Sequence, residues 1–128
     1  MTGRHFTFLA LLALVGGCGD SNQNPSGGGD LFVAYTGTGE AGAILLTISG
    51  GPVESVSAVG AQQISSTSPY ANTTKVVVLG EVGNGDLIRI RVPDVSAATQ
   101  YNVRADQVAD KTSFALIDPS RHTFSVHR

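Results

Sequence analysis

The chain has 128 residues, of which 14% are charged, and a formal net charge of −2. This length predicts one domain. Because binding to phosphates needs clustered Lys and Arg, and the sequence has no such cluster, we expect no nucleic-acid partner. A single cysteine excludes a disulfide framework within the chain.

The N-terminal segment is typical of an export signal. Arg4 and the amino terminus supply positive charge, and residues 6–15 (FTFLALLALV) form an apolar run. Ten helical residues span about 15 Å, roughly half of a bilayer core, so the run predicts a signal peptide rather than a membrane span. We therefore expect residues 1–17 to be a cleaved signal.

The end of this segment, Val15-Gly16-Gly17-Cys18, resembles the lipobox of bacterial lipoproteins. The resemblance implies that Cys18 receives a diacylglyceryl group and becomes the acylated first residue of the mature protein. Two or more acyl chains give stable membrane anchoring. The expected location is the bacterial cell envelope. In enterobacterial lipoproteins an Asp directly after the acylated cysteine resembles an inner-membrane retention signal. Asp20 lies one residue later, which favours the outer membrane. An ordinary secretory signal with an unrelated cysteine is the alternative.

Residues 18–30 are predicted to be the lipidated cysteine and a flexible linker. Residues 19–30 (GDSNQNPSGGGD) contain no apolar side chain that would offset the entropy of ordering them. Twelve residues of flexible coil have a root-mean-square reach of roughly 17–21 Å. The glycines at 27–29 lack the context of a phosphate-binding loop, because no strand precedes them and no Gly-Lys-Ser/Thr follows.

Residues 31–128 are predicted to form a small all-β domain. β-branched residues dominate, turn residues recur every eight to twelve positions, and no sustained helical period is present. We expect an antiparallel β-sandwich of seven or eight strands, with a partly closed barrel as the alternative. The strand segments are 31–35, 43–49, 53–59, 75–82, 87–92, 101–108, 113–117 and 123–127, with 62–67 as an additional short one. Residues 68–73 are predicted to be a loop, and residues 96–99 a single helical turn.

The clearest local signal is Asn84-Gly85 between two strand segments, 75–82 and 87–92. This pair favours a tight hairpin turn, because both residues accept positive φ. In the second arm apolar residues alternate with Arg89 and Arg91, which predicts a half-buried strand.

Three stretches, GAILLTISGG, VESVSAVG and GDLIRIRVPD, resemble small cohesin-like or immunoglobulin-like sandwich modules of bacterial envelopes. The resemblance spans residues 42–126 and implies a sandwich fold. Cohesins bind a partner module through one sheet face. The match transfers no binding residue, and fold analogy alone assigns no function.

Two features are candidate contact surfaces. Arg89, Arg91 and Arg104 are predicted to form a basic row on one sheet face, although charges on a solvated face are the simpler interpretation. Tyr70, in the predicted loop, is the aromatic residue expected to be exposed. The other aromatic residues of the domain sit mostly at strand positions and are core candidates; they are Phe32, Tyr35, Tyr101, Phe114 and Phe124.

No catalytic, metal or cofactor motif is present in the sequence. His122 and His127 are interpreted as solvated histidines, because a zinc site needs three or four ligands and no cysteine is free to contribute. No Gly-x-Ser-x-Gly elbow and no calcium loop of the Asp-x-Asp-x-Asp-Gly type is found. We therefore predict no catalytic residues, no metal and no cofactor.

The function that these observations favour is a lipid-anchored, non-enzymatic envelope module that acts through interaction or structure. Its expected contacts are the membrane, through Cys18, and an envelope protein or polysaccharide. A glycan- or peptidoglycan-binding module is the alternative. A hydrolase with an unrecognised site is the third hypothesis, and a deep pocket holding carboxylates of perturbed pKa would support it.

Overall fold

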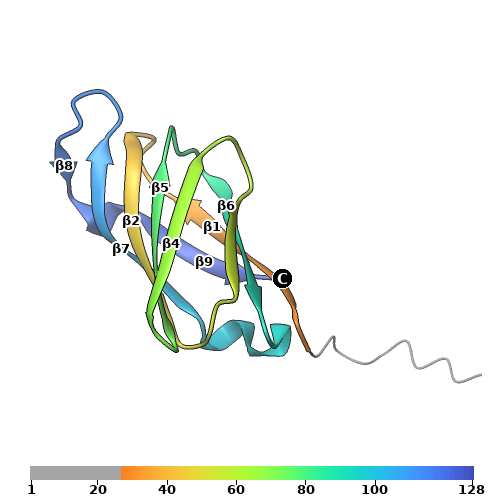
Figure 1. Cartoon of the computed structure of the whole chain (residues 1–128). Coiled ribbons are helices and arrows are strands. Elements are labelled where there is room, and N and C mark those ends of the chain that lie inside the picture. Colours follow the sequence, from red (N-terminus) through yellow and green to blue (C-terminus); the bar gives the residue numbers. More distant parts are fainter. Residues whose placement is uncertain (1–26) are drawn as a thin grey trace, which may run out of the picture.

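A computed structural model describes residues 27–128, so Cys18, the predicted signal peptide and most of the predicted linker lie outside the described residues. The described chain forms an antiparallel β-sandwich of nine strands in two sheets (Figure 1). This confirms the predicted fold class, with one or two strands more than expected.

The first sheet has four strands in the order β3-β6-β1-β9, and the second has five in the order β4-β5-β2-β7-β8. A 3-10 helix, Val95–Gln100, occupies the position of the predicted helical turn, and a second one spans Pro119–Arg121. The strands are β1 Gly29–Thr36, β2 Ala41–Ser49, β3 Ser55–Ala58, β4 Gln63–Tyr70, β5 Thr73–Leu79, β6 Gly85–Val92, β7 Asn102–Asp110, β8 Leu116–Ile117 and β9 Thr123–His127.

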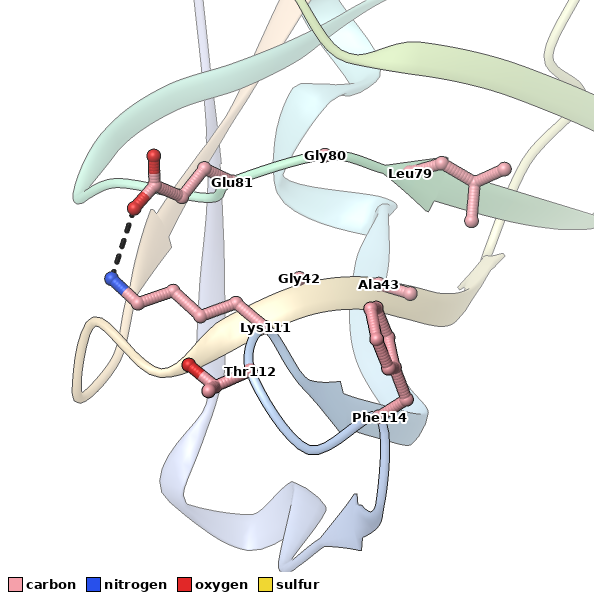
Figure 2. A pocket seen from close by; sticks show the side chains of 8 residues that line it. All are labelled: Gly42, Ala43, Leu79, Gly80, Glu81, Lys111, Thr112 and Phe114. Atoms are coloured by element: carbon pink, nitrogen blue, oxygen red, sulfur yellow. Dashed lines mark hydrogen bonds and ion pairs between the residues drawn. The ribbon is translucent and has the colours of Figure 1, made fainter.

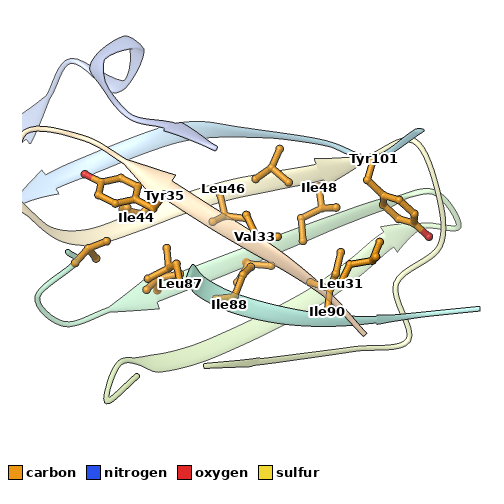
Figure 3. Close-up of a cluster of buried hydrophobic side chains, with 14 of the residues drawn as sticks. Leu31, Val33, Tyr35, Ile44, Leu46, Ile48, Leu87, Ile88, Ile90 and Tyr101 are labelled. Carbon is orange, nitrogen blue, oxygen red and sulfur yellow. The ribbon is translucent and has the colours of Figure 1, made fainter. Parts of the chain in front are cut away.

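The core lies between the sheets and is built from the inward positions of β1, β2, β5, β6 and β7. Alternation along each strand supplies these positions, because successive side chains point to opposite faces. Figure 3 shows the branched side chains of β2 meeting those of β1 and β6 across the two layers. The largest fully buried side chains include Tyr35, Leu31, Ile44, Leu46, Ile48, Leu87, Ile88 and Ile90.

The predicted hairpin at Asn84-Gly85 is wrong, because β5 and β6 lie in different sheets. β5 ends at Leu79, Gly80 takes a φ of +125°, and the buried Val82 carries the chain into the other layer. Gly85 does adopt a positive φ of +118°, as the turn signal required. Asn84 instead accepts a hydrogen bond from the Gly37 backbone through its side-chain oxygen, at 2.9 Å.

The predicted loop over residues 68–73 is also shorter than expected. β4 continues through Pro69 to Tyr70, and Tyr70 pairs with Thr73 across a two-residue turn. Proline is tolerated there because β4 is an edge strand whose pairing is interrupted between Thr67 and Tyr70. At the other boundary, β1 begins at Gly29, two residues before the predicted start of the domain.

The two ends of the sandwich differ in what they carry. The described chain begins beside the first 3-10 helix, where the Val95 amide donates to the Gly27 carbonyl. The loop between β7 and β8 lies at the opposite end, next to the start of β2, where the Lys111 amide donates to Glu40 (Figure 1).

Candidate functional site

The outer face of the five-stranded sheet carries a band of exposed and partly exposed side chains, most of them apolar, which we call the apolar strip. Two cross-strand rows form it, and the registers of β2 with β5 and β7 define them. The row nearer the β7–β8 loop, which we call the upper row, contains Gln63, Leu79, Ala43, Ala109 and Leu116. The other, which we call the lower row, contains Ser65, Val77, Leu45 and Gln107. Phe114, in the β7–β8 loop, adjoins the upper row.

Two side chains of the apolar strip are unusually exposed for their size. Phe114 is 80% exposed and Leu116 is 67% exposed. Scattered exposed apolar residues need no explanation, but a contiguous apolar patch with a polar rim is typical of an interaction surface. The apolar strip has this arrangement, with charged pairs at both of its ends.

The backbone at Phe114 is held in a conformation that side chains rarely adopt. Its φ is +59°, and it is the only non-glycine residue with positive φ among residues 27–128. A residue with a Cβ pays roughly 1–2 kcal/mol in this left-handed region. The cost falls on a large aromatic side chain that is itself exposed to water, so neither folding nor burial explains the choice of phenylalanine here.

Hydrogen bonds inside the β7–β8 loop fix this geometry. The Asp110 side chain accepts from the backbone amides of Thr112 and Ser113, at 2.8 and 2.9 Å. The Phe114 amide donates to the Asp110 carbonyl at 3.0 Å, and the Asp110 amide donates to Ala115 at 2.8 Å. The first two bonds hold the pKa of Asp110 below its usual range, because they favour the ionised carboxylate.

A hollow opens beside Phe114 at the upper end of the apolar strip (Figure 2). Its volume is about 650 Å³, with Phe114 and Leu79 on its sides and Gly42 and Ala43 between them. Lys111 and Glu81 form an ion pair at its rim, with Nζ and Oε1 2.9 Å apart. The hydrogen bond from Lys111 is the main cause of a lowered pKa at Glu81, so this carboxyl is not a general acid at neutral pH.

A smaller hollow of about 250 Å³ lies between the two rows on the same face. It is lined mainly by aliphatic side chains of β2, β5 and β8, including Leu45, Val77 and Leu116, with Gln107 as its polar member. The face therefore combines an exposed aromatic ring with an adjacent apolar depression.

A charged network closes the lower end of the apolar strip. Lys75 Nζ lies 2.6 Å from Thr47 Oγ1 and 3.0 Å from Asp106 Oδ2, and the Thr47 hydroxyl donates to the same carboxylate. Arg104 Nε approaches the other oxygen of Asp106 at 3.3 Å. Burial raises the pKa of Asp106, but the hydrogen bonds from Thr47 and Lys75 outweigh it and hold the pKa below its usual range.

The predicted basic row does not exist as one row. Arg89 and Arg91 lie on β6 in the four-stranded sheet, whereas Arg104 lies on β7 in the other sheet. Arg91 pairs with Asp30 and Glu54 at 3.6 and 3.8 Å, so acidic neighbours offset its charge. The predicted alternation of buried and exposed residues in β6 is confirmed. A local sequence pattern does not specify which sheet each strand joins.

Tyr70 is exposed, as predicted, with 74% of its surface accessible. It ends strand β4 rather than lying in a loop. Tyr70 lines neither of the two hollows on the apolar strip. It thus resembles an isolated exposed ring, and it is a useful control position.

Two sequence interpretations are corrected by burial. Phe114 was expected in the core because residues 113–117 read as one strand, but β8 begins only at Leu116. His122 was expected to be solvated, but it is 4% exposed, and its Nδ1 lies 2.5 Å from the hydroxyl of the buried Tyr35. Burial lowers the pKa of His122 and raises that of Tyr35, so both groups stay neutral at pH 7.

His127 is exposed and bonded at both ring nitrogens. Its Nε2 lies 2.6 Å from Asp86 Oδ1 and its Nδ1 lies 2.8 Å from the Arg128 carbonyl. The bond to Asp86 is the main cause of its raised pKa. Because neither nitrogen is free to take a proton from a hydroxyl, this pair lacks the geometry of a general base.

Within residues 27–128, no group of three or more His, Cys, Asp or Glu side chains is placed to hold a metal ion. The same part of the chain contains no helix of the length and apolar character needed to cross a bilayer. Comparisons of the chain with protein-family models, with curated proteins and with solved structures find no match.

Proposed function

We propose that this protein is a lipid-anchored module of the bacterial cell envelope, acylated at Cys18, that acts by binding rather than by catalysis. The observation that carries the proposal is the exposed Phe114 in its left-handed conformation, next to the apolar strip. Strain of this kind persists only when the surrounding structure enforces it, and it concentrates at functional positions.

The anatomy of the face supports a binding role. An apolar centre with a polar rim is the usual arrangement of protein interfaces, and aromatic residues are enriched at their centres. The ion pairs Glu81–Lys111 and Lys75–Asp106 supply the rim. The side chains around the larger hollow supply no carboxyl of raised pKa, which the hydrolase hypothesis requires.

The test compares three full-length chains by chemical crosslinking in native envelopes. The first is wild type, the second carries Leu79→Ser with Leu116→Ser in the apolar strip, and the third carries Tyr70→Ser. We expect crosslinked complexes with the wild type and with Tyr70→Ser, and their loss with the double variant. Equal crosslinking by all three chains would contradict the assignment of the surface.

The anchor is tested separately with Cys18→Ser. We expect this variant to lose incorporation of labelled palmitate and to leave the membrane fraction. Labelling or membrane retention equal to that of the wild type would contradict the proposed lipidation. Retention on an envelope polysaccharide that is abolished by Tyr70→Ala would instead favour the glycan-binding alternative.

A further inference from the structure

The order of charges along the apolar strip reads as self-complementary. The outward side chains near β5 are, in sequence, Lys75, Val77, Leu79 and Glu81, a cation and an anion with two aliphatic groups between them. If two such rows are laid against each other in opposite directions, each Lys75 faces a Glu81 and each Val77 faces a Leu79. The row is therefore complementary to an antiparallel copy of itself.

The neighbouring side of the strip repeats this order with the opposite sign. On and beyond β7 the outward groups run from Asp106 at the lower end to Lys111 at the upper end. Lys75 bonds to Asp106 and Glu81 bonds to Lys111, so the two ion pairs have opposite sense at the two ends of the strip. One rotation that reverses the strands thus places opposite charges together on both sides.

From this pattern we propose that the apolar strip binds a second copy of the same chain, face to face about a two-fold axis. The inference rests on the proposed binding function and names the partner. The axis lies midway between the facing five-stranded sheets of the two copies. It runs across the strands and passes between the upper and lower rows. Such an interface is isologous, because the same patch serves both copies, and near-alignment of strands is usual when two sheets pack face to face.

The relief of the surface fits the same rotation. Phe114 adjoins the upper row, so the rotation places its ring over the lower row of the partner copy. That row contains Leu45 and Val77, which line the smaller hollow of about 250 Å³ together with Ala43, Ala109 and Leu116 of the upper row. An exposed ring that covers an apolar depression supplies the central anchor that protein interfaces commonly have.

The size of the strip predicts a weak dimer. Five strands about 4.8 Å apart, and the six residue steps from Lys75 to Glu81 at about 3.3 Å each, outline a rectangle of about 20 by 20 Å. This projected area lies at or below the small end of specific interfaces, which bury about 800 Å² per partner. Confinement to a membrane raises the effective concentration of each copy for the other, so anchoring favours the association.

The experiment places the photoreactive residue p-benzoylphenylalanine at Phe114 in the full chain, with Cys18 intact, and irradiates native membranes. We expect a product of twice the mass of the chain, with the crosslink mapped to Leu45 or Val77 of the second copy. The same probe at Tyr70 is the control and should give no such product.

The outcomes separate this inference from the proposed function. Crosslinks to a different protein, with none between copies, would overturn the dimer and leave the binding function standing. Crosslinks to lipid alone, or no product at all, would overturn both.

A charge-reversal series tests the register of the dimer. Lys75→Glu should reduce the yield of the crosslinked dimer by roughly threefold or more, because it places two anions opposite each other. Adding Glu81→Lys should restore yield, since the reversed order is again self-complementary. If the double variant crosslinks no better than Lys75→Glu alone, the antiparallel arrangement is wrong.

Discussion

The strained backbone at Phe114 predicts an unusual result, a substitution that stabilises the domain while it removes the binding surface. Phe114→Gly should relieve the left-handed conformation, whose φ is +59°. The relief amounts to roughly 1–2 kcal/mol. Glycine also gains entropy in the unfolded chain, which offsets about 0.4–1 kcal/mol of this. The expected net gain in the free energy of unfolding is therefore about 0.5–1 kcal/mol.

The matched control is Phe114→Ala, which removes the ring but keeps a Cβ in the strained conformation. Because neither variant retains the aromatic anchor, any loss of self-association is common to both and cancels in the comparison. Urea denaturation at equal protein concentration measures the difference, and a gain of 1 kcal/mol would raise the melting temperature by about 4–8 °C in a domain of this size. If Phe114→Gly is less stable than Phe114→Ala, the strain argument is refuted.

Three further predictions concern the interior. Acidification from pH 7 should destabilise the fold through His122, because its folded pKa is lowered, so the unfolded chain binds more protons below about pH 6.5. The raised pKa of His127 has the opposite effect on the free energy of unfolding, so the loss of stability on acidification should be steeper in His127→Gln. Urea midpoints measured at pH 7.5 and 5.5 test this, and a higher midpoint at pH 5.5 would contradict it. Tyr35→Phe should cost about 1–3 kcal/mol by leaving the buried Nδ1 of His122 without its partner, and an unchanged midpoint would contradict that role. Gly50→Ala should cost more than about 2 kcal/mol, since its φ is +99° and an added Cβ would lie 1.9 Å from the Gln100 carbonyl oxygen; circular dichroism during thermal unfolding measures the loss, and wild-type stability would show that the turn relaxes freely.

Much of the fold followed from local pattern because the strands are regular. The continuous apolar run of residues 43–49 predicts a central strand covered on both faces. β2 does lie in the middle of its sheet between β5 and β7, but Ala43 and Leu45 on its outer face are only partly buried. The alternation around Arg89 and Arg91 predicted one buried and one exposed face, and β6 has both. These signals depend only on the direction of successive side chains, which a sequence specifies directly.

The pairing of strands did not follow, because it depends on where the chain crosses between layers. Asn84-Gly85 marks a true turn, yet Gly80 and the buried Val82 redirect the chain before it, and the two flanking strands enter different sheets. The candidate site could not be predicted for the same reason, because it too depends on the pairing of strands. Its rows combine residues from β2, β4, β5, β7 and β8, and only the register of those strands places Leu79 and Leu116 in one row, with Ala43 and Ala109 between them.

Phe114 was misplaced for a different reason. An aromatic residue among apolar neighbours ordinarily indicates a strand position, and residues 113–117 follow that rule. What distinguishes the position is the Asp110 side chain, which accepts hydrogen bonds from the amides of Thr112 and Ser113. In this turn Phe114 adopts the left-handed conformation that glycine usually adopts. An Asp four residues before a phenylalanine is a weak signal, although Asp-initiated turns of this kind have a known mechanism.

The proposed dimer also constrains how the protein stands on its membrane. The described chain begins at the end of the sandwich opposite the β7–β8 loop. Reversal of the strands by the two-fold axis therefore puts the two N-terminal ends at opposite ends of the dimer. Both predicted linkers reach one membrane if the strands lie parallel to its surface, because half the width of a five-stranded sheet, about 10 Å, is within their reach of roughly 17–21 Å. Removal of residues 19–26 takes away the part of the predicted linker that precedes the described chain, so it should lower dimer crosslinking in membranes; unchanged crosslinking would show that the two copies do not share this flat arrangement.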